Sequence, residues 1–336
     1  MIRLVVGDLH LSADPRERYR LDFALNEIPK LDDTYKPDQI ILLGDLCHEK
    51  DNHPASLVNE IVDLFARLAK QVEIIILQGN HDFSHVGHPY FQFLKNIKGI
   101  TWVGRPTVIA GSLFLPHTRD YNRDWAKVDF RGHDFIFAHN IFTGAAAGGQ
   151  KLSGIPVNAL PKIARVISGD VHEPQTFGQI TYVGAPYLCT YGEDYEPRVL
   201  LLTGVEVQSL RVGGPQKRLI NVSVAEVNGI RELLFDDSIR SARPGDFCKI
   251  RVTLPMKFKA DWVSIRQEVL GWFRDLVISS IVPIVEYVPG DRVELSGSFK
   301  KSDAEYFKAY VDRVALDKFT AQVGEGLMRE NSGEVQ

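Results

Sequence analysis

Short apolar segments recur through the first half of the chain, and each ends abruptly in a small residue followed by polar side chains. The segments are three to five residues long and rich in Ile, Val and Phe; they span residues 2–6, 40–43, 74–77, 135–138 and 165–167. Runs of this length and composition are typical of buried strands. The first half of the chain is therefore predicted to contain five buried strands.

A helical periodicity separates the second and third of these strands. Apolar residues repeat there on one helical face: Leu57, Ile61, Leu64, Phe65 and Leu68. Alternation of strands and helices predicts an α/β fold in which helices cover the outer faces of a mostly parallel sheet. Ligand sites in such sheets form beyond the carboxyl ends of the strands, which is where the polar clusters of this chain stand.

The pattern changes after residue 182. Residues 199–202 and 205–212 predict a hairpin that turns at a Thr-Gly pair. The stretch over residues 216–245 has a mixed character and closes with a turn-forming Arg-Pro-Gly-Asp sequence, so it is interpreted as a connector. The larger unit before it then covers residues 1–215.

A second, smaller α/β unit is predicted over residues 246–300. Residues 247–254 alternate as a strand, residues 262–272 have helical spacing, and residues 281–288 predict another strand. Pro283 places that last strand at the edge of a sheet, because proline has no N–H to donate to a neighbouring strand.

The last segment, residues 301–336, is predicted to be helical. Ser302 and Glu305 have the spacing of a capping box at the start of a helix. Apolar residues further along fall on one helical face, so this segment either packs on its own unit or binds a partner.

Charge and cysteine content narrow the class of protein. The formal net charge of −4 over 336 residues gives no general sign of nucleic-acid binding. Cys47, Cys189 and Cys248 form no CxxC pair, which argues against a disulfide framework or a thiolate zinc site and suits a reducing cytoplasm. The N-terminal apolar run is too short for a signal peptide, and no stretch reaches the roughly 20 apolar residues of a membrane span. We therefore expect a cytoplasmic protein without a membrane segment.

Residues able to bind a metal ion stand directly after the apolar segments. They carry carboxylate, imidazole and amide groups: Asp8, His10, Asp45, Asn80, His139, Asp170 and His172. This mixture suits borderline-to-hard divalent ions such as Mn²⁺ or Fe²⁺, whereas a structural zinc ion takes four ligands and commonly uses cysteine. Seven candidates are too many for one ion and suffice for two ions that share a carboxylate.

The ordered motifs resemble those of the calcineurin-like metallophosphoesterase superfamily over roughly residues 1–175. They read Asp8-x-His10, Gly44-Asp45, Gly79-Asn80-His81-Asp82, His139 and Gly169-Asp170-x-His172. The resemblance implies a four-layer αββα sandwich with a small α/β C-terminal capping domain. It also implies a phosphoesterase that uses two divalent metal ions.

The resemblance further implies a role for each residue of the motifs. The ligands of one ion are then Asp8, His10 and His172; those of the other are Asn80, His139 and Asp170, with Asp45 as the bridge. His81 matches the family's catalytic histidine, which protonates the leaving group. The last family motif usually reads G-H-x-H, and Asp170 replaces its first histidine here. A carboxylate can still bind Mn²⁺, or Asp170 lies outside the ligand shell.

His48 favours one branch of the superfamily. Protein Ser/Thr phosphatases carry G-D-x-V-D-R-G in the second motif, whereas this chain reads Gly-Asp-Leu-Cys-His-Glu-Lys over residues 44–50. The G-D-x-x-H form is similar to that of the Mre/SbcD nucleases of recombination and repair, where this histidine orients the DNA phosphate or the catalytic histidine. The alternative is a structural role for His48.

This narrower resemblance implies a substrate, a metal and partners. It implies a Mn²⁺-dependent DNA exonuclease and endonuclease, with Mg²⁺ or Fe²⁺ as alternative metals, that forms a homodimer. Residues 246–300 correspond in order and size to the DNA-capping domain of these nucleases. Residues 301–336 correspond to the helical segment that binds an SbcC/Rad-type, SMC-like ATPase. The short chain is more similar to compact bacterial and phage members, such as the small subunit of T-even phage recombination endonucleases, than to eukaryotic ones.

Four basic residues are candidates for contact with DNA: Arg16, Arg18, Arg20 and Arg123. The first three follow the first motif in a loop-like stretch. The last is interleaved with Tyr121 and Trp125, a mixture suited to phosphate contact and base stacking. The simpler interpretation of both groups is a solvated charged face. The remaining histidines are interpreted as non-ligands: His53, His85, His88, His117 and His133.

Two other functions fit the same sequence. A small-molecule or cyclic-nucleotide phosphodiesterase would use the same site, although the unit after the core speaks against it. A protein that kept the fold but lost one metal ion would be a binding or scaffold protein, and Asp170 is the residue that leaves this interpretation open.

Overall fold

The first sheet of the structure combines the N-terminal strands with a hairpin that returns to them. The computed structural model describes residues 1–85, 87–162 and 165–286. The strand order in this sheet is β14-β13-β1-β2-β3-β4. Its strands are β1 (Ile2–Val6), β2 (Gln39–Leu42), β3 (Glu73–Leu77), β4 (Ile100–Val103), β13 (Arg198–Thr203) and β14 (Glu206–Arg211). Strands β1 to β4 run parallel, and the β13–β14 hairpin predicted from the sequence joins β1 in antiparallel pairing.

A second six-stranded sheet has the order β11-β12-β10-β7-β6-β5. Its strands are β5 (Thr107–Ile109), β6 (Ser112–Leu115), β7 (Ile136–His139), β10 (Val166–Gly169), β11 (Gln175–Phe177) and β12 (Ile180–Tyr182). The four central strands run parallel, and the outer strands β11 and β5 are antiparallel to their neighbours.

The two sheets pack face to face through an apolar layer. Val5, Ile41 and Ile75 point into this layer, whereas their neighbours Leu4 and Val6 belong to the apolar cluster on the outer face of the first sheet. Successive side chains of a strand point to opposite faces, so strands buried on both faces are apolar at consecutive positions. This explains the continuous apolar segments of the sequence, and the predicted strands are confirmed.

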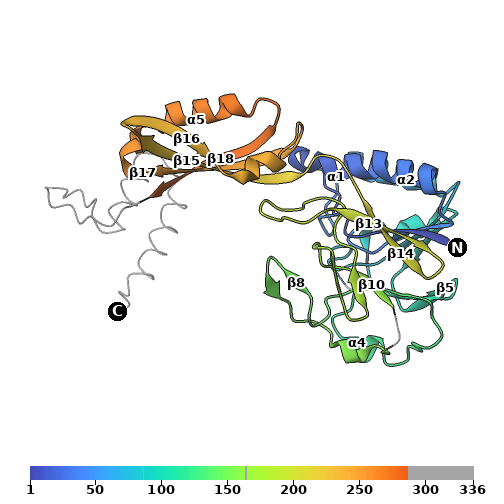
Figure 1. Cartoon of the computed structure of the whole chain (residues 1–336). Coiled ribbons are helices and arrows are strands. Elements are labelled where there is room, and N and C mark those ends of the chain that lie inside the picture. Colours follow the sequence, from blue (N-terminus) through green and yellow to red (C-terminus); the bar gives the residue numbers. More distant parts are fainter. Residues whose placement is uncertain (86, 163–164, 287–336) are drawn as a thin grey trace, which may run out of the picture. The chain divides into compact units, whose positions relative to one another are not determined.

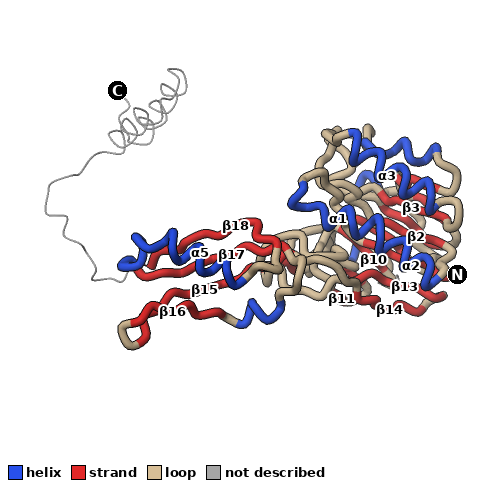
Figure 2. Tube along the Cα trace, turned by 90° about the horizontal axis from the view of Figure 1, so that it is seen from above, coloured by secondary structure: helices blue, strands red, loops and turns tan. Residues whose placement is uncertain are grey.

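Helices cover the outer face of the first sheet (Figure 2). They are α1 (Arg18–Asp22), a π-helical turn (Phe23–Glu27), α2 (Ile28–Tyr35) and α3 (Ala55–Leu68). The predicted face of α3 is buried, with Leu57, Ile61, Leu64, Phe65 and Leu68 each at most 4% exposed. Helix α3 therefore packs on the sheet as its periodicity predicts.

Loops and short elements cover the outer face of the second sheet. They include α4 (Tyr121–Asp124), a 3-10 turn (Val157–Ala159) and the ribbon of β8 (Ala146–Ala147) and β9 (Gln150–Lys151). Trp125 and Phe142 pack there against the sheet. The predicted α/β sandwich is confirmed, although its second outer layer contains little helix among the described residues. Two further 3-10 segments lie at Pro15–Glu17 and Tyr90–Asn96.

A four-stranded sheet of order β16-β15-β17-β18 follows the sandwich (Figure 1). Its strands are β15 (Lys217–Val227), β16 (Ile230–Phe235), β17 (Phe247–Pro255) and β18 (Val277–Glu286). Helix α5 (Trp262–Trp272) packs on one face through Ile265 and Val269, and Trp272 is 66% exposed rather than buried with them. Two 3-10 turns, Asp237–Ser241 and Met256–Asp261, join these elements.

The predicted connector over residues 216–245 is wrong. Most of it is the β15–β16 hairpin, and β15 also pairs in parallel with β17. Val222 and Val224 are buried along β15 while polar residues alternate with them, so a half-buried strand was mistaken for a mixed linker. Pro283 lies in β18, the outer strand of the described sheet. Residues 287–300 and the predicted helical segment 301–336 lie outside the described residues.

Candidate metal centre

The metal-ligand candidates come together where the parallel strands of both sheets end. The first sheet contributes Asp8, His10, Asp45 and Asn80, and the second contributes His139, Asp170 and His172. Asp8 and His139 are fully buried, and Asp45 and His10 are at most 4% exposed. Buried carboxylates and imidazoles at such density need partners or cations, because isolated buried charges are costly.

Asp45 occupies the middle of this cluster. One carboxylate oxygen, Oδ2, lies 3.4 Å from His10 Nε2, and the other, Oδ1, lies 3.4 Å from His139 Nε2. Each oxygen therefore faces a different histidine. This is the arrangement that a carboxylate shared by two cations requires.

On one side of Asp45, two imidazole nitrogens face each other. His10 Nε2 and His172 Nε2 are 3.1 Å apart. Asp8 lies in the same region, with one oxygen accepting the Asp170 N–H at 2.9 Å and the other, Oδ2, buried without a hydrogen-bond partner. Two ring nitrogens beside a buried carboxylate oxygen that has no hydrogen-bond partner suit a shared cation.

On the other side of Asp45, Asn80 and His139 face each other. Asn80 Oδ1 lies 2.9 Å from His139 Nε2 and close to both Asp45 oxygens. An amide oxygen among acceptor atoms is repelled unless a cation lies between them, and rotating the amide would instead place its NH₂ there. Asp170 Oδ1 is 3.8 Å from His139 Nε2, so Asp170 is adjacent to this group.

These contacts indicate that the ligand atoms of the cluster suit divalent cations. Within the described residues, the ligand atoms of Asp8, Asp45 and His139 lie within 4.8 Å of one another, as do those of a second group formed by His10, His48 and His81. Oxygen and imidazole ligands together suit Mn²⁺, Fe²⁺ or Mg²⁺ better than a thiolate-preferring ion. The three described cysteines, including Cys47 beside the second motif, are buried and outside this set.

Glycines allow the strand ends to approach so closely. A Cβ on Gly44, whose φ is +102°, would lie 2.5 Å from His139 Nδ1, and one on Gly79 would overlap the Asp45 carboxylate. Three of the candidate ligands themselves have positive φ: His10 at 41°, Asp45 at 51° and Asp170 at 77°. Such backbone conformations cost about 1–3 kcal/mol each and are typical of functional sites.

Several groups that the sequence did not identify hold the candidate ligands. His139 Nδ1 donates to the Leu43 carbonyl, which leaves Nε2 directed at Asp45 and Asn80. Glu193 Oε1 lies 3.7 Å from His172 Nδ1. Partners of this kind fix the ring orientation and tautomer of metal-binding histidines. Glu193 lies in a loop far along the chain from the motifs, so no sequence spacing indicated it.

Asp82 joins two of the motif loops. Its carboxylate accepts hydrogen bonds from the backbone N–H groups of Asp45 at 3.0 Å, Leu46 at 2.9 Å and Gly79 at 2.6 Å. Asp82 therefore links the loop after β2 to the loop after β3 through these hydrogen bonds. The sequence placed it in a motif without giving it this role.

The carboxylates and imidazoles of the cluster shift one another's pKa values. Burial raises the pKa of Asp8 to about 6. Burial also acts to raise the pKa of Asp45, but the neighbouring His139 and His10 hold it well below its usual range. Burial acts to lower the pKa of His139, and the Asp45, Asp170 and Asp8 carboxylates raise it well above its usual value. A divalent cation would take the place of the proton on His139, since metal ligands bind deprotonated.

His81 and His48 form a pair at the open side of the cluster. The His81 N–H donates to Asp45 Oδ1 at 2.8 Å, and His81 Nδ1 donates to the His48 carbonyl at 2.7 Å. The two rings are stacked with centroids 5.7 Å apart, and the His10 ring lies 4.8 Å from that of His81. His81 is partly exposed and His48 is exposed. The pair can therefore meet a ligand bound at the cluster.

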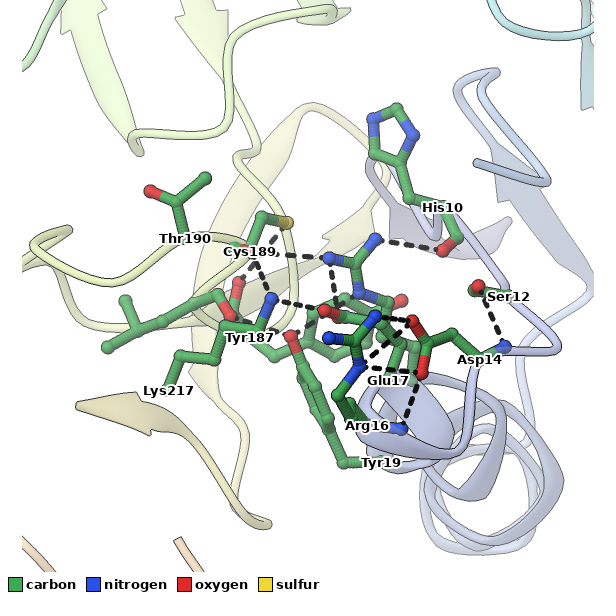
Figure 3. Close-up of polar contacts among 12 residues, drawn as sticks. His10, Ser12, Asp14, Arg16, Glu17, Tyr19, Tyr187, Cys189, Thr190 and Lys217 are labelled. Atoms are coloured by element: carbon green, nitrogen blue, oxygen red, sulfur yellow. Dashed lines mark hydrogen bonds and ion pairs between the residues drawn. The ribbon is translucent and has the colours of Figure 1, made fainter. Parts of the chain in front are cut away.

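Arg20 is buried beneath the cluster, against the expectation that it contacts DNA. It is 4% exposed, and its guanidinium donates to the carbonyl of His10 at 3.1 Å and to that of Cys189 at 3.2 Å. Glu17 Oε2 lies 2.7 Å from Arg20, and Glu17 Oε1 pairs with Lys217, the first residue of β15 (Figure 3). Lys217 Nζ donates to the Cys189 carbonyl at 3.0 Å. This buried network joins the backbone of a candidate ligand to the start of the C-terminal sheet.

Arg20→Met is expected to lower the free energy of unfolding by about 3–5 kcal/mol, since it removes one member of a buried ion pair. Urea denaturation followed by circular dichroism measures this change. The control is Arg18→Met on the same helix, because Arg18 forms ion pairs with Asp22 and Glu60 that are partly exposed. Such pairs contribute at most about 1 kcal/mol. Equal losses in the two variants would contradict a structural role for the buried network.

The other arginines that were predicted to contact DNA lie on the surface, where each forms an ion pair with a carboxylate. Arg16 pairs with Asp14, Arg18 with Asp22 and Glu60, and Arg123 with Asp124. These contacts match the simpler interpretation of a charged face as much as they match DNA binding. Within the part of the chain that the structure describes, no helix is long and apolar enough to cross a membrane.

Comparison with known proteins identifies the family. The family model for calcineurin-like phosphoesterases matches residues 1–174, just over half of the chain. Among solved structures, the chain is similar to the nuclease MPE of Pseudomonas putida, with 16% identity, a TM-score of 0.32, and coverage of 62% of this chain and 87% of that one. No curated protein matches the chain. The match over residues 1–174 spans every motif that forms the buried cluster, and the chain belongs to the calcineurin-like phosphoesterase family of metal-dependent hydrolases.

Proposed function

We propose that this hydrolase is a phosphodiesterase that cleaves DNA, of the Mre/SbcD type, with Mn²⁺ as its preferred ion. The observation that supports a two-metal site best is the position of Asp45, with one carboxylate oxygen facing His10 and the other facing His139. The preference for DNA rests on His48 after the second motif and on the α/β unit that follows the sandwich.

The residues that would hold the ions divide on either side of Asp45. Asp8, His10 and His172 form one set, and Asn80, His139 and Asp170 form the other. Divalent ions bound there supply Lewis acidity toward the phosphoryl oxygens and a nucleophile at neutral pH. Asp170 is the weakest candidate ligand, because its carboxylate is 3.8 Å from His139 Nε2 and partly exposed.

His81 and His48 would act on the phosphodiester itself. The bond from His81 Nδ1 to the His48 carbonyl fixes the ring, so Nε2 is the atom that can donate a proton to the leaving oxygen. His48 stacks on His81 and acts as a positioning residue. A positioned proton donor contributes roughly 10²–10⁴-fold to the rate.

Metal dependence and substrate choice test this proposal together. Metal-stripped full-length protein should show no activity, and Mn²⁺ should restore it more strongly than Mg²⁺, with about two ions per chain by elemental analysis. The substrates are linear and hairpin DNA and bis-p-nitrophenyl phosphate. Hydrolysis of the small diester without DNA cleavage would point to a small-molecule phosphodiesterase, and inactivity on both with one ion or none would point to a binding protein.

We also propose a homodimer that works with an SbcC/Rad-type ATPase. Support comes from the sequence resemblance and from the predicted C-terminal helical segment at residues 301–336. Purification of the tagged full-length chain from its own cells should retain such an ATPase, identified by mass spectrometry, and light scattering should give twice the mass of one chain. Recovery of a monomer without an ATPase would contradict these partners and leave the hydrolase assignment unchanged.

A further inference from the structure

A large groove with a volume of about 1180 Å³ opens beside the metal centre. Its walls come from the segments that follow β3, β4 and β6, together with the 3-10 segment Tyr90–Asn96 and helix α4. These strands belong to both sheets and run parallel within them. The groove therefore continues the same line of carboxyl strand ends that forms the metal centre, which is where ligands bind in such sheets.

Direct contacts connect the groove to the centre. Gln78, in the groove wall, directly precedes the Gly79-Asn80 motif, and its carbonyl accepts the His117 N–H at 2.9 Å. The His117 ring lies 6.2 Å from that of His139. His117, which the sequence predicts to be a non-ligand, lines the groove and lies next to the candidate ligand His139. The groove therefore lies next to the Asn80 and His139 side of the centre.

The groove is cationic although the chain as a whole carries a net charge of −4. Four basic residues line it: Lys95, Arg105, Arg119 and Arg123. Within the described residues, Arg123 is paired with Asp124, whereas no ion pair involves Lys95, Arg105 or Arg119. All three of these unpaired residues are exposed. Clefts lined by one sign of charge concentrate ligands of the opposite sign.

Two acidic residues, Asp120 and Asp124, also line the groove. Asp124 accepts hydrogen bonds from Arg123 and Thr118, and Asp120 accepts the backbone N–H of Arg123 at the start of α4. The Asp124 charge is therefore paired within the wall, whereas the backbone N–H leaves the negative charge of Asp120 uncompensated, and the lining still has two more basic than acidic residues. The positive charges of the other lining residues remain available to an anion.

The walls of the groove also contain aromatic surface. Trp102 is partly exposed, and Phe83 and Trp125 also line the groove as buried side chains. Gly104 carries no side chain over this part: a Cβ there would lie 3.0 Å from Gln78 Oε1 and 3.5 Å from Trp102 Nε1. Gly104 thus places no side chain beside Trp102, whose ring is partly exposed although its Nε1 is buried.

We propose that this groove binds unpaired nucleotides of the DNA strand whose phosphodiester lies at the metal centre. This inference rests on the proposed function and adds a site for the strand beyond the cleaved bond. Cationic walls with aromatic surface are the features that bind single strands, by phosphate contact and base stacking. A duplex keeps its bases stacked inside and offers only its backbone to such a hollow. The volume also exceeds the upper end of small-molecule pockets, about 1,000 Å³.

A triple variant, K95A/R105A/R119A, tests the groove directly. The probe is fluorescein-labelled oligothymidylate, bound in EDTA so that no cleavage occurs, and fluorescence anisotropy is measured over a range of salt concentrations. Each phosphate contact on a single strand contributes about −0.7 to the slope of log K against log salt. Loss of three contacts should weaken binding about tenfold or more and make the slope less steep by about 2.

The control variant is R67A/K70A/K98A. These three residues are exposed, do not line the groove, and form no ion pair within the described residues. The control removes the same number of charges, and one of them, Lys98, lies just before β4 whereas Arg105 lies just after it. Binding and its salt slope should stay near those of the unchanged protein.

Cleavage provides the second measurement. In the groove variant, the ratio of kcat/KM for the oligonucleotide to kcat/KM for bis-p-nitrophenyl phosphate should fall about tenfold or more, because the small diester does not reach the groove. Equal effects of the two triple variants, or no change in slope, would overturn the groove proposal. Failure of the unchanged protein to hydrolyse any diester would instead overturn the proposed function, because binding in EDTA is measured independently of it.

Discussion

Asp45→Ala is expected to remove bound divalent metal and to reduce phosphodiester hydrolysis by about 10³-fold or more. Loss of a single positioned electrostatic group costs about 10²–10³ in rate, and this residue lies between two sets of candidate ligands. His10 Nε2 and His139 Nε2 each lie 3.4 Å from one of its oxygens, so no neighbouring carboxylate duplicates its position. Elemental analysis and the rate with bis-p-nitrophenyl phosphate measure the two effects.

A carboxylate at the surface provides the control for this variant. Asp129 is exposed, pairs with Arg131 and contacts none of the candidate ligands among the ion pairs and hydrogen bonds of the described residues. Asp129→Ala should therefore keep both metal content and rate. If Asp45→Ala also retained two ions and full activity, a bridging role for Asp45 would be untenable.

His81→Ala should reduce DNA cleavage by roughly 10²–10⁴-fold, the contribution of a positioned proton donor, while leaving metal content unchanged. The loss should be much smaller with bis-p-nitrophenyl phosphate, because p-nitrophenolate leaves readily without a proton. Comparing the two substrates in the same preparation separates proton donation from general damage to the site. His133→Ala is the control, since His133 is partly exposed and contacts only the Asp129 carbonyl among the hydrogen bonds of the described residues.

The metal content of His81→Ala also shows whether His81 is a metal ligand or a proton donor. His81, His48 and His10 have ligand atoms within 4.8 Å of one another, so His81 is also placed to bind an ion. Loss of one ion in His81→Ala, with equal rate losses on both substrates, would make His81 a ligand and contradict its role as proton donor.

The sequence predicted those residues of the site whose position can be inferred from a single motif. Asp8 and Asp45 follow neighbouring parallel strands, and the carboxyl ends of parallel strands share one edge of a sheet. The convergence of these two carboxylates was therefore predictable before any distance was known, whereas His139 ends a strand of the second sheet and meets them only because the two sheets pack together. Asp170 was identified as the irregular member of the set, and it lies at the margin of the cluster, 3.8 Å from His139 Nε2.

The parts that were missed depend on contacts between distant segments. Glu193 reaches His172 from a loop that carries no motif, and Arg20 turns inward because Glu17 and two carbonyl groups surround its guanidinium. An arginine that follows a motif in a loop-like stretch has the same sequence signature whether it faces solvent or the core. The β15–β16 hairpin was missed for a related reason, since only one face of β15 is buried and its alternation includes polar residues.

The network between Arg20 and Lys217 has a consequence for the design of protein fragments. A fragment ending at residue 215 keeps every candidate metal ligand, yet it loses Lys217, which pairs with Glu17, and Gln216, whose side chain accepts the Leu188 N–H at 2.8 Å. Gln216 is in turn held by the Asp246 carboxylate at 2.8 Å. A fragment of this hydrolase that folds on its own should therefore extend beyond the β-sandwich and include the four-stranded sheet.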